Sequence, residues 1–166
     1  MSTQEFEKKY HLYKDLLYRI SFTYAKNQAD AEDLLQEVFV KLLYQAPAFE
    51  STEHEKRWLI RVTVNLAKNF VKSTWSRQKD SLESHELEIP WTMDLEKQEL
   101  LHEVLQLPDK CKAVVYLHYY EGYTCKEISK MLGLTLSAVK MRLKKGRSLL
   151  KMNLSEGGTF YETGRI

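Results

Sequence analysis

Residues 124–150 read TCKEISKMLGLTLSAVKMRLKKGRSLL, and this stretch predicts two helices joined by a tight turn. Thr124 and Glu127 have the S/T-x-x-E spacing of a capping box, which satisfies free backbone N–H groups where a helix begins. Gly133 stands where the first helix must stop and reverse, a position that favours left-handed backbone angles. Thr135 is suited to cap the second helix. Two helices in this arrangement form a helix-turn-helix, whose second helix enters the DNA major groove.

The second of these helices is predicted to have an apolar face and a basic face. Its apolar side recurs at helical spacing and comprises Val139, Leu143, Gly146 and Leu150. The opposite side comprises Ser137, Lys140, Met141, Lys144 and Ser148, flanked by Lys145 and Arg147. Five basic residues and no acid lie between positions 140 and 147. Because lysine and arginine neutralise phosphates and donate to guanine, we predict DNA binding rather than an ordinary core helix with a solvated face.

Charged residues divide the chain into modules. The 166 residues have a formal net charge of +2, which alone predicts no nucleic-acid partner. Residues 109–150 contain nine basic and three acidic side chains, whereas residues 79–108 contain two basic and eight acidic ones. This alternation predicts separate modules. The acidic, polar stretch over 79–94 contains one proline and predicts a linker, with a surface loop of a single domain as the alternative. The predicted organisation is a domain over 1–78, this acidic linker over 79–94, a second domain over 95–152 and a polar tail over 153–166.

Helical periodicity recurs along the chain and strand signals are sparse. The predicted fold is therefore all-α, with two small helical domains joined by a flexible acidic linker. In the first domain we expect helices over 6–24, 31–44 and 55–76, with Asp30 capping the second helix and a loop over 46–55. In the second domain we expect helices over 95–107 and 109–121, followed by the helix-turn-helix.

Two helices of the first domain carry polar clusters. The helix over 31–44 presents Asp33, Gln36 and Glu37 on one side, which suits either a basic protein partner or a solvated face. The helix over 55–76 has a narrow polar stripe with Trp58 beside it, and bases stack on aromatic rings where single-stranded nucleic acid binds. Taken alone, the stripe is better explained as a solvated face beside a core tryptophan. Its members are Arg57, Arg61, Asn65, Lys68 and Lys72.

The sequence lacks the marks of several other protein classes. It has no signal-peptide core near its start and no window approaching about 20 apolar residues, so we expect a cytoplasmic protein without a membrane segment. Cys111, Cys125 and His118 lack the spacing of a zinc site. No P-loop, nucleophile motif or metal pair is present. We therefore expect no metal, no cofactor and no enzymatic activity.

Four segments, taken in order, resemble an extracytoplasmic-function (ECF) sigma factor of bacteria. DAEDLLQEVFVKLL (30–43) is similar to the family's segment for binding core RNA polymerase. RWLIRVTVNLAKNFVKS (57–73) is similar to its promoter-melting and −10-recognition helix. LPDKCKAVVYLHYYEGYTCKEIS (107–129) resembles the start of its second domain, and GLTLSAVKMRLKKGRSLL (133–150) resembles its −35-recognition helix.

The resemblance implies a transcription initiation factor that binds core RNA polymerase, recognises −35 and −10 promoter elements and aids promoter melting. It also implies promoter DNA and an anti-sigma factor as partners. The implied polymerase contacts are Asp33, Gln36 and Glu37. The implied −10 contacts are Phe49, Arg57, Trp58, Arg61, Asn65 and Lys68. The implied −35 contacts and their supports are Thr135, Ser137, Lys140, Met141, Arg142, Lys144, Lys145 and Arg147.

Several positions depart from the family pattern, among them Lys112 and Lys140, where arginine is commoner, and two further positions of the last helix. Met141 stands where the family often has a small polar residue, so we expect the base read there to differ. Gly146 replaces a usual alanine, which is expected to weaken the helix by up to about 1 kcal/mol.

The main alternative is a stand-alone helix-turn-helix regulator. It would account for residues 109–150 but leave the polar clusters of the first domain unexplained. An enzyme with a DNA-binding tail is a third alternative, disfavoured because no catalytic motif is present.

Overall fold

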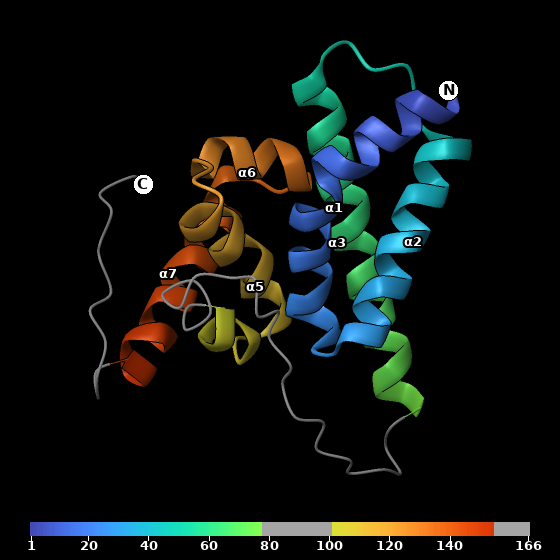
Figure 1. Cartoon of the computed structure of the whole chain (residues 1–166). Helices are drawn as coiled ribbons and strands as arrows, with labels where there is room; N and C mark the ends of the chain where they lie inside the picture. Colours follow the sequence, from blue (N-terminus) through green and yellow to red (C-terminus); the bar gives the residue numbers. More distant parts are fainter. Residues whose placement is uncertain (78–100, 155–166) are drawn as a thin grey trace. The chain divides into compact units, whose positions relative to one another are not determined.

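All the regular structure in the described part of the chain is helical (Figure 1). The computed structural model describes residues 1–77 and 101–154, and it describes the side chains of 1–73 and 101–150. The chain divides into two compact units, Met1–Glu88 and Ile89–Ile166. The all-α prediction is therefore confirmed for the described ranges. The predicted linker over 79–94 and most of the predicted tail lie outside them.

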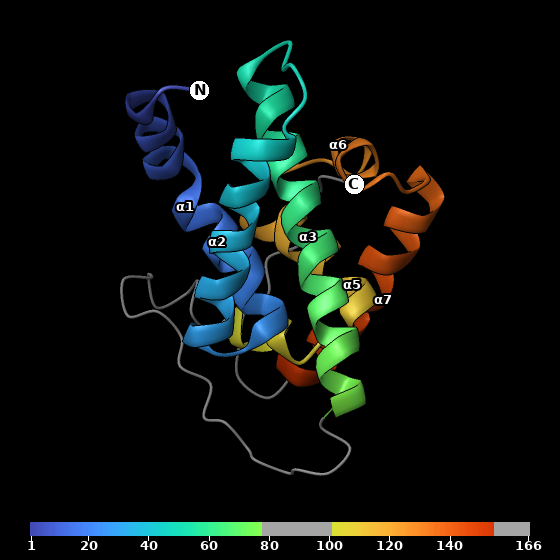
Figure 2. The same cartoon turned by 90° about the vertical axis from the view of Figure 1, so that its right-hand side faces the viewer.

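Three helices form the first unit: α1 (Thr3–Ala25), α2 (Gln28–Gln45) and α3 (Thr52–Arg77). Each helix packs against the other two, and Figures 1 and 2 show them running alongside one another. The packed faces bury Leu17 and Ile20 of α1, Val38 of α2, and Leu59 and Ile60 of α3. Burying a side chain of this size contributes about 1.5–3 kcal/mol relative to leaving it in water.

The predicted cap of α2 is wrong by three residues. Asn27 is the cap, because its Oδ1 accepts a hydrogen bond from the Asp30 backbone N–H at 2.9 Å. Asp30 instead lies in the first turn, where its carboxylate accepts from the Asn27 side-chain amide at 2.7 Å. Asn and Asp are both strong N-cap residues, so the sequence alone did not separate the two positions.

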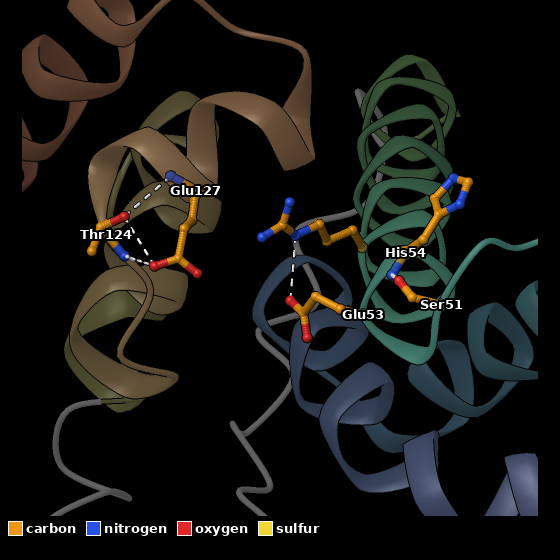
Figure 3. A network of polar contacts seen from close by, with 6 residues as sticks. Ser51, Glu53, His54, Thr124 and Glu127 are labelled. Carbon is orange, nitrogen blue, oxygen red and sulfur yellow. Dashed lines mark hydrogen bonds and ion pairs between the residues drawn. The ribbon is translucent and has the colours of Figure 1, made fainter.

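The helix α3 also begins earlier than predicted. It starts at Thr52 rather than near Glu55. The Ser51 hydroxyl accepts a hydrogen bond from the His54 backbone N–H at 3.0 Å, as a helix cap does (Figure 3). The loop between α2 and α3 is therefore shorter than the one predicted over 46–55.

The second unit contains α5 (Asp109–Val115), a π-helix η2 (Tyr116–Tyr120), α6 (Cys125–Leu132) and α7 (Leu136–Leu154). Residues 101–105 are also helical. The helix predicted over 109–121 thus changes to the wider π-helical winding in its last part. α7 packs against both α5 and α6. Their shared core includes Val114, Ile128 and Leu143.

The helix-turn-helix prediction is confirmed. The Thr124 hydroxyl accepts from the Glu127 N–H at 3.2 Å, and the Glu127 carboxylate accepts from the Thr124 N–H at 3.3 Å, which completes the capping box (Figure 3). Gly133 ends α6 with a φ of 66°, in the left-handed region that glycine adopts without strain. The Thr135 hydroxyl accepts from the Ala138 N–H at 3.1 Å where α7 begins.

Gly146 lies where α7 meets α5, and it is buried. A methyl group added there would overlap Cγ2 of Val115 and come within 3.7 Å of Cys111 Cβ. Valine is β-branched and stiff at χ1, so its methyl group cannot swing aside at little cost. The expectation of a weaker helix considered helix propensity alone. In the structure, the absent side chain at Gly146 is what lets the two helices approach.

Candidate nucleic-acid and protein interfaces

The helix α7 has the two faces that its sequence predicts. Val139, Leu143, Gly146 and Leu150 are buried. The predicted base-facing side is exposed throughout and comprises Ser137, Lys140, Met141, Lys144, Lys145 and Ser148. Arg142 and Arg147 are half-buried, and Thr135 is exposed at the cap. The structure therefore brings the predicted −35 residues together along one helix.

The positive charge on this face is uncompensated within the described residues. No carboxylate of the described ranges pairs with Lys140, Lys144 or Lys145. Three unpaired ammonium groups along one helix face favour an anionic partner with repeated charges, and a phosphate backbone has that property.

Positively charged side chains of α7 also influence the pKa of a buried thiol in the core. Burial raises the pKa of the Cys111 thiol, while the positive charges of Lys145 and Arg142 act in the opposite direction. Cys111 is thus a buried core thiol, without the lowered pKa that is typical of reactive cysteines.

A second surface lies on α2. Asp33, Gln36 and Glu37 are all exposed, and none of them makes an ion pair or hydrogen bond with the described residues. The structure therefore places this predicted polymerase contact on one accessible helix face.

The same face of α2 continues into exposed apolar side chains, which were not predicted from the sequence. Val40, Leu43 and Tyr44 are 52%, 42% and 82% exposed. The spacing of positions 33, 37, 40 and 44 places them on one side of a helix, so periodicity carried the signal. This face is polar toward its N-terminal end and apolar toward its C-terminal end.

The third surface combines the loop before α3 with the exposed stripe of α3. The Phe49 ring packs edge-on against Trp58, with centroids 5.6 Å apart, and against His54 at 5.5 Å. Both Phe49 and Trp58 are half-buried. The structure thus joins the two predicted aromatic residues of the −10 surface into one cluster.

The predicted basic residues of the −10 surface follow this cluster along α3. Arg61 and Asn65 are exposed, whereas Arg57 and Lys68 are half-buried. The Arg57 guanidinium lies 3.3 Å from the Glu53 carboxylate, so its charge is partly shared within the helix.

The buried carboxylate of Glu55 connects this surface to α1. Glu55 is 7% exposed, and its two oxygens accept from Lys9 Nζ at 2.5 Å and from the Tyr13 hydroxyl at 3.1 Å. The same Lys9 ammonium lies 5.9 Å from the centre of the Phe49 ring. Partial burial works to lower the pKa of Lys9, but the hydrogen bond and charge of Glu55 outweigh it and raise that pKa. This pair was not predicted, since no local pattern links residues 46 positions apart.

Other chemistry is not indicated in the described part of the chain. Among the described residues, no group of three or more His, Cys, Asp or Glu side chains is placed to hold a metal ion. Cys111 and Cys125 are buried and form no disulfide. None of the described helices combines the length and apolar character that a bilayer crossing requires.

Comparison with known proteins relates both units to transcription initiation factors. Residues 10–77 match the model for Sigma-70 region 2, and residues 97–150 match that for Sigma-70 region 4. The chain is 30% identical over 145 residues to the RNA polymerase sigma factor SigV of Bacillus subtilis (strain 168), with 87% of each chain covered. It is 28% identical to the ECF RNA polymerase sigma factor SigX of the same organism, over 91% of this chain and 84% of that one.

A solved structure shares the fold. The sigma factor RpoE from Bartonella quintana, in complex with the anti-sigma factor NepR, superimposes with a TM-score of 0.71 at 18% identity. The match covers 94% of this chain and 100% of RpoE.

Proposed function

The chain belongs to the extracytoplasmic-function sigma factors, and we propose that it binds core RNA polymerase and directs the enzyme to specific promoters. The observation that carries this is the presence of both sigma regions, in order, in one chain. A stand-alone helix-turn-helix regulator would account only for the second region. The match over residues 10–77 therefore favours the sigma factor.

We assign the exposed face of α2 to core polymerase. Asp33, Gln36 and Glu37 would make charge-assisted hydrogen bonds with a basic surface. Val40, Leu43 and Tyr44 would add apolar area at the same contact. Protein interfaces commonly combine apolar patches containing aromatic residues with polar surroundings, and this face offers both.

The loop before α3 and the stripe along α3 are assigned to the −10 element. Phe49 and Trp58 offer aromatic surface to an unstacked base. Arg57, Arg61 and Lys68 supply positive charge for the strand backbone, and Asn65 supplies a polar group beside them. The half-buried rings, the exposed Arg61 and the half-buried Arg57 and Lys68 together support this assignment.

The exposed face of α7 is assigned to the −35 element. Lys140, Met141, Lys144 and Lys145 would face base edges or phosphates in the major groove. Thr135, Ser137, Arg142 and Arg147 lie at the cap and the margins of this face, where they would contact the DNA backbone or support the helix.

The remaining properties follow from the family. We propose a first domain over 1–78, a linker over 79–94 and a second domain over 95–152. The protein would act in the cytoplasm and contribute no catalytic group of its own. An anti-sigma factor is proposed as a further partner, supported by the NepR-bound structure of the related fold.

Transcription with purified components tests this proposal. Core polymerase would be mixed with the full chain and a library of promoter-length duplexes, and the initiated transcripts would be sequenced. We expect initiation at a small set of promoters sharing two spaced elements, dependent on the chain. A chain that binds specific duplexes alone, with no effect on initiation by core polymerase, would instead be a stand-alone regulator.

A further inference from the structure

Met141 is an apolar side chain in the middle of the basic face of α7. It is 71% exposed. On a helix its neighbours are the residues three and four positions away, here Ser137, Ala138, Lys144 and Lys145. A single exposed methionine needs no explanation on an ordinary surface. This one stands among unpaired ammonium groups on the helix that we assign to the major groove.

The major groove offers such a side chain one prominent apolar partner. The base edges there present mainly hydrogen-bond donors and acceptors, and the 5-methyl group of thymine is the largest apolar group among them. The thioether of methionine is at most a weak acceptor and cannot replace the water that polar base edges would lose. Contact with the donor and acceptor groups of a base edge would therefore desolvate them without compensation.

We propose that Met141 contacts the 5-methyl group of one thymine in the −35 element and thereby selects thymine at that position. The inference rests on the proposed function of α7. Phosphate contacts made by the neighbouring lysines Lys140, Lys144 and Lys145 would help to hold the helix in register. The unbranched methionine side chain can adjust to the methyl group once the helix is seated.

The test replaces thymine by deoxyuridine, which lacks only the 5-methyl group. The full chain bound to core polymerase first selects its upstream element from randomised duplexes. Each thymine of that element, on either strand, is then replaced singly by deoxyuridine, and promoter affinity is measured. For the wild-type protein we expect affinity to fall about fourfold at one position, the effect of one buried methyl group.

Variants identify the residue responsible. Met141→Ala should bind the thymine and deoxyuridine promoters equally, while Met141→Leu should retain most of the difference. Leu136→Ala is the matched control, since Leu136 is another exposed apolar residue of α7, at 40% exposure. It should keep the wild-type pattern. Because Met141 is solvent-exposed, these variants are expected to fold normally.

Three results would overturn the inference while leaving the proposed function intact. One is a selected element with no fixed thymine, and another is equal affinity for deoxyuridine at every position. The third is a deoxyuridine penalty that persists in Met141→Ala. Failure to select any element in the presence of core polymerase would overturn both proposals together.

Discussion

The two basic surfaces of this protein are built in different ways. The face of α7 depends on local signals: a capping box at Thr124, a left-handed glycine at Gly133 and a cap at Thr135. The surface around α3 depends on distant residues, because Lys9 of α1 reaches the buried Glu55 and lies near the Phe49 ring.

The difference suits two kinds of DNA. A helix with fixed ends and an evenly charged face fits an intact duplex, whose grooves have a regular shape. A loop that carries aromatic rings fits bases that have left the stack, since unstacking costs a few kcal/mol and stacking on a ring returns about 1–3 kcal/mol per base. The chain contains no nucleotide-binding motif, so we expect it to capture transiently open bases rather than drive melting by hydrolysis.

The largest expected effect concerns the affinity of the first unit for core polymerase, which the exposed face of α2 is proposed to provide. The double variant Asp33→Lys, Glu37→Lys should weaken binding to core polymerase on the order of 100-fold, because like charges facing each other across an interface cost several kcal/mol. Affinity would be measured by fluorescence anisotropy of the labelled chain. The matched control Glu7→Lys reverses an exposed charge on α1 and should bind normally. Unchanged affinity in the double variant would remove the polymerase assignment from α2.

The next effect tests the packing beneath the duplex-reading helix. Gly146→Ala should destabilise the second unit by about 1–3 kcal/mol, the usual cost of overpacking, although helix propensity alone predicts a gain of up to about 1 kcal/mol. Urea denaturation would measure it. In a Val115→Ala background the overlapping methyl group is gone, so the same substitution should be neutral or stabilising. A stabilising Gly146→Ala in the wild-type background would show that the helices do not approach so closely.

A smaller effect tests the long-range support of the −10 surface. Lys9→Met removes one partner of the buried Glu55 carboxylate and should cost about 1–2 kcal/mol in the free energy of unfolding. Lys8→Met changes an exposed neighbour on α1 and serves as the control. Equal stability of the two variants would contradict a supporting role for Lys9.

The pH dependence of the same comparison has a definite sign. Because the pKa of Lys9 is raised in the folded protein, its contribution is complete below the ordinary lysine pKa of 10.5 and is lost as pH rises through the folded value. The stability difference between wild type and Lys9→Met should therefore be constant from about pH 7 to 9 and shrink only above about 10.5.

The features predicted most accurately from the sequence are those that depend on residues close together along the chain. The capping box, Gly133, the Thr135 cap and both faces of α7 were readable because each depends on residues within a few positions. The stripe of α3 was readable for the same reason. The cap of α2 was misplaced because Asn27 and Asp30 are both good caps, and only the backbone path decides between them.

Contacts between distant segments could not be predicted in this way. The Lys9–Glu55 pair joins two helices, and nothing near either residue indicates it. The close approach at Gly146 involves Val115 on another helix, which helix propensity does not take into account. The apolar end of the α2 face was within reach of periodicity, but Val40 and Tyr44 look like core residues until the packing is known.

The most direct test of the account compares two variants on two promoters. One variant carries Arg57→Ala, Arg61→Ala and Lys68→Ala in α3, and the other carries Lys144→Ala and Lys145→Ala in α7. Initiation with core polymerase is measured on a duplex promoter and on the same promoter with a pre-opened −10 bubble.

Removing three charge-assisted interactions should lower duplex initiation by the α3 variant at least about tenfold, and the bubble should restore much of it. The α7 variant should stay impaired on both promoters. When the logarithm of its promoter affinity is plotted against the logarithm of the salt concentration, the slope should be smaller in magnitude by about one for each phosphate that the variant no longer neutralises. Equal rescue of both variants by the bubble, or of neither, would contradict the division between a duplex-reading unit and a strand-capturing unit.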